Sequence, residues 1–171
     1  MNVDYKKKID KASEYINLKK YTIALKMLEK LTIEYPEYYK AYQKIGFIYS
    51  LLRQWEKAIN FYDEAISRND KEPMLYFSRA RYLMQNGNFK LALLDIDYLL
   101  ILEHKNNSNY YVETSFFLRG IINFNLGNYK EAILDCKKVR DDFVIYILGE
   151  KQSKEFLIKN SLSEINLLEK S

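Results

Sequence analysis

Four alanines recur along the chain at an almost constant interval, and each follows an aromatic residue by three positions. Ala24, Ala58 and Ala92 are 34 residues apart, while Ala132 follows 40 residues after the third, which indicates a six-residue insertion. An interval of this length is typical of stacked supersecondary units, because one unit cannot bury its apolar face without a neighbour. The interval therefore predicts that most of the chain folds as a repeat array.

A second small residue stands twelve positions before each of these alanines. Small side chains at both positions allow two antiparallel helices to pack closely, because larger side chains would wedge them apart. Turn signals such as Asn86-Gly87-Asn88 lie between the two positions. Each unit is therefore expected to be a helical hairpin, and its additional small residue is Ala12, Gly46, Ala80 or Gly120.

The pattern resembles the tetratricopeptide repeat (TPR) family, whose 34-residue consensus places aromatic, small and aliphatic residues at fixed positions. The second unit matches best, with Tyr42, Ile45, Gly46, Tyr49, Trp55, Ala58, Tyr62 and Ala65 in place. Proline is expected but missing at Asp70, His104 and Val144, and tyrosine is missing at Asn123. The resemblance implies an all-α solenoid of about four TPR hairpins in a single domain, residues 1–171, with repeats at approximately 5–38, 39–72, 73–106 and 113–146.

The C-terminal segment, residues 147–170, has apolar residues at helical spacing. It predicts a capping helical segment that covers the last face of the stack. The alternative is a degenerate fifth repeat that opens at Ile145, but its Gly149 comes only 29 residues after Gly120 and is out of register, so we favour the cap. The insertion near 107–112 is rich in Asn and predicts a loop, which is either functional or a tolerated lengthening.

Composition and charge narrow the class of partner. The net charge is +4, with lysines spread over every segment, whereas a nucleic-acid footprint should cluster on one face. No apolar run approaches the roughly 20 residues that cross a bilayer, and the first residues lack the apolar core of a secretory signal. The single cysteine is compatible with a reducing compartment. We therefore expect a cytoplasmic protein with neither a nucleic-acid nor a membrane partner.

Residues that could carry chemistry are isolated from one another. The single histidine, His104, has no ligand-type residues at metal-binding spacing. Cys136 falls at a core position of its repeat and is expected to act as a small buried apolar residue. Asp95, Asp97 and Asp135 indicate no shared site, and no nucleophile or phosphate-binding motif is present. We predict a non-enzymatic protein with no catalytic residues, metal site or cofactor.

In the TPR family, the first helix of each unit lines a concave groove, and helix geometry places the corresponding positions on one face. The resemblance therefore implies a groove rich in phenylalanine and methionine, formed by Lys40, Gln43, Phe47, Met74, Phe77, Arg81, Met84, Phe117, Ile121 and Phe124. Some family members hold acidic chaperone tails with a carboxylate clamp, but here its positions carry Ile9, Ser13, Lys44, Met74 and Ser78.

These features predict a non-catalytic scaffold that binds an apolar or amphipathic peptide, or a partner protein, in the groove. Adaptor, chaperone-like and immunity-type roles all fit this description, whereas the missing clamp argues against a chaperone acidic C-terminal tail as the ligand. The alternative is a self-assembling, homodimeric structural module. In that case, its own C-terminal helix or a second subunit covers the groove.

Overall fold

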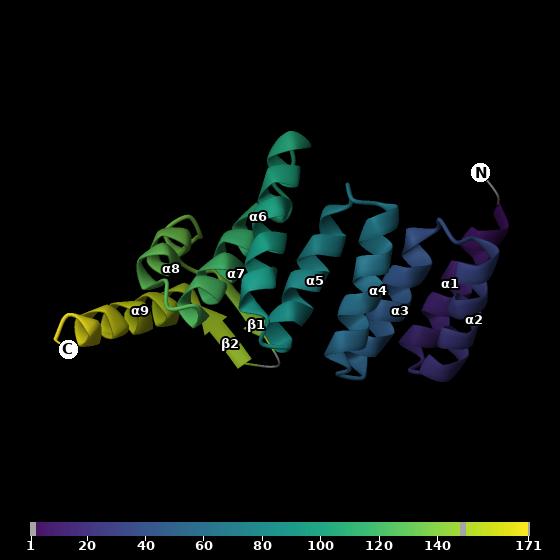
Figure 1. Ribbon diagram of the computed structural model, residues 1–171, viewed down its shortest axis with the longest axis horizontal. Helices are drawn as coiled ribbons and strands as arrows, with labels where there is room; N and C mark the ends of the chain where they lie inside the picture. The colour runs from purple at the N-terminus through teal and green to yellow at the C-terminus, as the bar shows by residue number, and fades with distance from the viewer. Residues whose placement is uncertain (1–2, 148–149, 171) are drawn as a thin grey trace. The chain divides into compact units, whose positions relative to one another are not determined.

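The computed structural model describes residues 3–147 and 150–170, which form helical hairpins followed by one short β-hairpin and a last helix (Figure 1). Its contacts divide the chain into two compact units, Met1–Asn86 and Gly87–Ser171. The first unit holds α1 (Val3–Asn17), α2 (Tyr21–Glu34), α3 (Tyr39–Leu51), α4 (Trp55–Arg68) and α5 (Pro73–Gln85). The second holds α6 (Phe89–Lys105), α7 (Val112–Asn125), α8 (Tyr129–Cys136), β1 (Val144–Ile147), β2 (Glu150–Ser153) and α9 (Lys154–Leu168).

In the first unit, each helix packs against the next one along the chain, from α1 to α5. The small residues of the repeat lie at these contacts, and Ala12, Ala24 and Ala58 are fully buried. A Cβ atom on Gly46 would lie 2.7 Å from Cδ2 of Tyr62, so α3 and α4 can approach this closely only with glycine there. The predicted role of the small residues is thus confirmed.

The turns within hairpins share one geometry. Lys19, Arg53, Gly87 and Gly127 all have positive φ, from 56° to 80°, and they recur at the repeat interval. After α3, the amide of Gln54 donates to the carbonyl of Tyr49 at 2.9 Å, which is the long hydrogen bond of a Schellman C-cap. This turn reverses the chain within three residues and sets the two helices of a hairpin side by side.

In the second unit, α6 packs on α7, α7 on α8, and α9 on both α7 and α8. Leu157 of α9 is buried, and its Cδ2 lies 3.4 Å from the point where a Cβ on Gly120 would stand. The predicted C-terminal helix is therefore present, and it covers the fourth hairpin.

The predicted start of the capping helical segment at residue 147 is wrong, because helix α9 starts at Lys154. Residues 144–147 instead pair antiparallel with residues 150–153, with Val144 opposite Ser153. The run Val144-Ile-Tyr-Ile147 consists of β-branched and aromatic residues, which favour a strand, and Ser153 then caps α9 by accepting the amide of Phe156 at 3.2 Å. The fourth hairpin is correspondingly short, since α8 ends at Cys136.

The alternative of a degenerate fifth repeat that opens at Ile145 is wrong, because Ile145 lies in strand β1 and not in a helix. Its Gly149 lies outside the described residues. The single-domain boundary of 1–171 stays a prediction.

Candidate interaction surfaces

In the first unit, the predicted groove residues of α3 and α5 come together on one surface. Nε2 of Gln43 on α3 donates to Sδ of Met74 on α5 at 3.5 Å. Phe47 and Met74 are 41% and 46% exposed, and Phe77 is half-buried beneath Arg81, whose guanidinium carbon lies 5.8 Å from the ring centroid. We call this surface the α3/α5 face, formed by Lys40, Gln43, Lys44, Phe47, Met74, Phe77 and Arg81.

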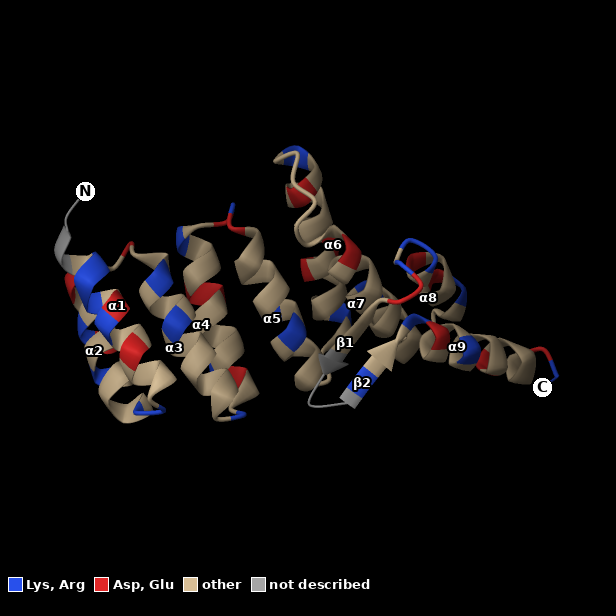
Figure 2. Cartoon of the chain, turned by 180° about the vertical axis from the view of Figure 1, so that it is seen from behind, with Lys and Arg blue, Asp and Glu red and all other residues tan. Residues whose placement is uncertain are grey.

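Basic residues lie on both α3 and α5, whose Lys and Arg positions are blue in Figure 2. Among the described residues, Lys40, Lys44 and Arg81 form no ion pair, whereas Arg68 and Arg119 do. Burial of its ammonium group lowers the pKa of Lys44, an effect that nearby Asp10 opposes and Lys40 reinforces. Exposed apolar side chains among unpaired cations are suited to a ligand that is both apolar and acidic.

Three predicted groove residues lie in the core. Phe117 is fully buried, and the ring of Phe143 packs edge-on against it with centroids 5.5 Å apart. Ile121 and Met84 are only 9% and 8% exposed. Phe124 remains half-buried, with its ring 5.5 Å from that of Tyr129. Sequence reasoning missed Phe143 because it lies at the end of the fourth repeat, at no consensus position and in no helix. The aromatic and β-branched run that begins with it was the available signal.

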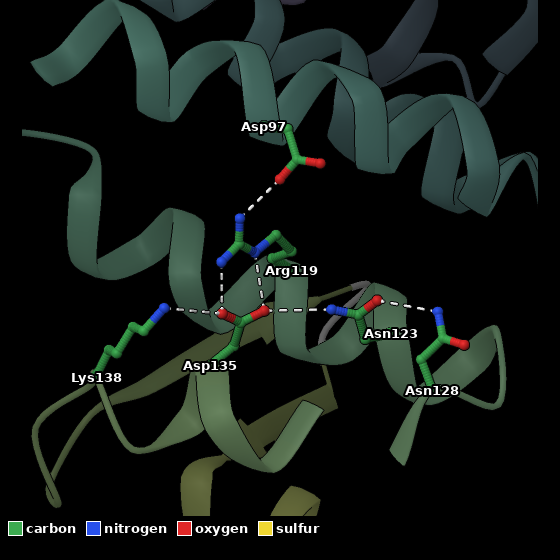
Figure 3. A network of polar contacts seen from close by, with 6 residues as sticks. All are labelled: Asp97, Arg119, Asn123, Asn128, Asp135 and Lys138. Carbon is green, nitrogen blue, oxygen red and sulfur yellow. Dashed lines mark hydrogen bonds and ion pairs between the residues drawn. The ribbon is translucent and has the colours of Figure 1, made fainter. Parts of the chain in front are cut away.

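A network of polar side chains joins three helices of the second unit (Figure 3). Arg119 on α7 donates from Nε and Nη2 to both carboxylate oxygens of Asp135 on α8, at 2.8 and 2.7 Å. Its Nη1 donates to Asp97 on α6 at 2.7 Å. Asn123 and Asn128 extend the chain of hydrogen bonds. The hydrogen bonds that Arg119 donates to Asp135 raise the pKa of Arg119 above its ordinary value, against the effect of burial.

This network explains a departure from the repeat pattern. Asn123 stands where tyrosine is expected, and Arg119 stands where the second unit has Ile45. Asp97 and Asp135, which sequence reasoning left unconnected, share one guanidinium. All three donating nitrogens of Arg119 are engaged, so the cluster is a structural clamp rather than a reactive site.

The six-residue insertion is closed by a buried carboxylate. Glu103 is 1% exposed, and its Oε2 accepts the hydroxyl of Ser108 at 3.1 Å and the amide of Tyr111 at 2.9 Å. Tyr110 is 82% exposed and its ring packs edge-on against Tyr111. The insertion is therefore an organised loop that presents one aromatic side chain.

The remaining candidates for chemistry are separated in space. Cys136 is fully buried, and burial, aided by Asp135, raises its pKa to about 11, which keeps the thiol protonated at neutral pH. His104 is exposed. Within residues 3–147 and 150–170, no three His, Cys, Asp or Glu side chains are grouped so as to hold a metal ion. None of the described helices is long and apolar enough to span a membrane.

Part of the sequence and the fold of this chain are similar to those of known repeat proteins. Residues 39–72 match the family model of the tetratricopeptide repeat. A tetratricopeptide repeat protein from Parabacteroides merdae has a similar structure, with a TM-score of 0.70 and 23% identity over 81% of this chain and 53% of its own. The type III secretion chaperone SycD of Yersinia enterocolitica, solved with a peptide of the translocator YopD, has a TM-score of 0.64 and 19% identity over 74% of this chain and 95% of its own.

Half of the chain also aligns in sequence with a curated relative. The serine/threonine-protein phosphatase T of Aspergillus oryzae is 29% identical over 86 residues, which are 50% of this chain and 17% of the phosphatase. The chain thus spans a small part of that relative and just over half of the Parabacteroides protein. Residues 39–72 therefore match a tetratricopeptide repeat, and the described helices share the fold of a solved tetratricopeptide repeat protein.

Proposed function

We propose that the protein is a non-catalytic interaction scaffold whose α3/α5 face binds a segment of a partner protein. The observation that carries the proposal is the combination on this face of exposed Phe47 and Met74 with Lys40, Lys44 and Arg81, which form no ion pair within the described part of the chain. The ligand is an amphipathic segment with apolar anchors and acidic residues beside them. Adaptor, chaperone-like and immunity-type roles are all consistent with such a segment, and the cytoplasmic location stays a prediction.

The bound YopD peptide in the structure of SycD supports this proposal, because a similar helical fold there holds a segment of another protein. The ligand expected here differs from an acidic chaperone tail, since Ile9 and Ser78 are buried where the clamp would need polar groups.

The substitution Phe77→Asp tests the α3/α5 face. It places a carboxylate among the apolar anchors, and should abolish capture of the partner from the native host while helical circular dichroism is retained. The matched control is Asn60→Asp, an exposed position on α4, which should capture the partner as the native protein does. Unchanged capture by Phe77→Asp would contradict the proposal. Phe117→Asp is not a groove variant, because its ring is in the core and the substitution should unfold the second unit.

The self-assembling module is the second candidate, and α9 is the observation in its favour. Phe156, Leu162 and Leu167 of this helix are 48–60% exposed, and Leu162 lines an open hollow of about 750 Å³ with Ile158. Light scattering of the pure chain separates the two candidates. A monomer is expected of the scaffold, and a dimer that Leu162→Glu converts to monomers would favour self-assembly.

A further inference from the structure

The outward side of α6 carries an apolar stripe that the helical array does not require. Leu91, Leu94 and Ile101 are 53%, 64% and 61% exposed, and Tyr98 continues the row at 37%. We call these four residues the α6 stripe. Their spacing of three, four and three residues is that of a coiled-coil seam, which suits one partner helix.

The second repeat provides an internal comparison for the stripe. Thirty-four residues earlier, the same register positions on α4 carry Lys57, Asn60, Glu64 and Ser67, all exposed. Polar residues therefore serve at these positions in the same supersecondary unit, because the packed face of the helix lies on the other side. Helix packing within the repeat therefore does not require apolar residues at these positions of α6, whereas binding of a ligand there would favour them.

A hollow adjoins the stripe at Ile101. It has a volume of about 470 Å³ and is lined by Asp97, Leu100, Ile101, His104, Phe116 and Arg119, all in the second unit. The centroid of the Phe116 ring lies 5.3 Å from the guanidinium carbon of Arg119 and 4.4 Å from the ammonium of Lys138. The hollow offers a place for one large apolar side chain of a helix docked along the stripe.

The charges along α6 indicate the chemistry of that helix. Lys90 and Lys105 stand at the two ends of the stripe, are exposed, and form no ion pair among the described residues. The acidic residues of α6 are not available to them: Asp95 and Glu103 are buried, and Asp97 is bound to Arg119. The stripe is thus an apolar seam with a cation at each end, about 22 Å apart at 1.5 Å per residue.

A second copy of the stripe is a poor occupant for this surface. Antiparallel pairing over the full length places Lys90 against the other copy's Lys105, and parallel pairing places each lysine against itself. We propose that the α6 stripe binds an amphipathic helix of another protein, with an apolar heptad seam and acidic residues at both ends. This surface shares no residue with the α3/α5 face.

Fluorescence anisotropy with two synthetic peptides tests the proposal on the full chain. Both are helices of about 18 residues with leucine at the seam positions; one has glutamates at its two ends and the other has lysines. The native chain should bind the glutamate peptide at least about tenfold more tightly than the lysine peptide at low salt. Leu91→Gln with Leu94→Asn and Ile101→Ser, which copies the polar character of α4, should weaken that binding by about tenfold or more.

Two further variants keep the test decisive. Lys90→Glu with Lys105→Glu leaves the apolar seam intact and should reverse the preference, so that the lysine peptide binds more tightly. Phe77→Asp on the α3/α5 face should leave binding of both peptides unchanged. Equal binding by the native chain and the stripe variant would overturn the proposal. So would light scattering that shows a dimer which the stripe variant dissociates, because the occupant would then be a second copy.

Discussion

At the scale of single residues, backbone strain recurs with the repeat. Lys19 and Arg53 adopt φ of 57° and 56°, where the later hairpins carry Gly87 and Gly127. The left-handed conformation costs an L-residue roughly 1–2 kcal/mol, and glycine avoids this cost. The first two turns therefore contain a local conflict between side chain and backbone that the last two turns lack.

Arg53→Gly should raise the free energy of unfolding by about 0.5–1 kcal/mol, because the relief of strain exceeds the roughly 0.5–1 kcal/mol of added chain entropy. Urea denaturation followed by circular dichroism measures this change. In the opposite direction, Gly127→Ala should cost about 1 kcal/mol from backbone strain. No atom lies within 4 Å of the added Cβ, so steric clash does not contribute. An Arg53→Gly chain of native or lower stability would show that the turn is not strained.

At the scale of elements, a polar clamp joins α7 to α8 at repeat positions where α3 and α4 carry the apolar residues Ile45 and Phe61. Asp135 is 3% exposed and holds Arg119 of the neighbouring helix with two hydrogen bonds. Glu113, in the first turn of α7, accepts the amide and Nε of Arg140 at 2.8 and 3.0 Å, and so fixes the turn that follows α8. The clamps determine how α6, α7 and α8 pack.

Asp135→Ala should destabilise the protein by about 3 kcal/mol, because it leaves a largely buried guanidinium with Asp97 as its remaining carboxylate. The matched comparison is Glu64→Ala, which removes the exposed partner of Arg68 within α4 and should cost less than about 1 kcal/mol. Both values come from denaturation curves. Equal losses in the two variants would mean that the Arg119 network contributes no more than a surface ion pair.

The Glu113 clamp predicts a pH dependence. The hydrogen bond from the Arg140 amide, with the Arg140 side chain, lowers the pKa of Glu113 below its ordinary value of 4.5. A carboxyl with a lower pKa in the folded state contributes stability that is present above the unfolded-state pKa and is lost as pH falls through the folded pKa. Thermal melts between pH 6 and pH 3 should therefore show a steeper loss for the native chain than for Glu113→Gln. Parallel melting curves would contradict this assignment.

At the scale of the whole molecule, much of the fold was predictable because its signals are local and repeated. The 34-residue interval and the buried small residues indicated helical hairpins, and Gly46 lies where only glycine fits against Tyr62. The β-hairpin was missed because its first residues, 144–146, were assigned to the fourth repeat and the rest to the capping helix. The register also predicted a shared surface of α3 and α5, and Gln43 on α3 does contact Met74 on α5. That this surface binds a ligand stays a prediction.

Side chains at the same repeat position can be partly exposed in one hairpin and buried in another, and the tertiary structure determines which. Phe77 and Phe117 occupy equivalent places on α5 and α7, yet Phe77 is half-buried on a surface and Phe117 lies in the core beneath Phe143. The sequence by itself determined the period, the hairpins and the face on which each ring stands, because helix geometry acts over a few residues. Whether that face stays open depended on a segment some 26 residues away along the chain, since burial is a property of what packs against a side chain.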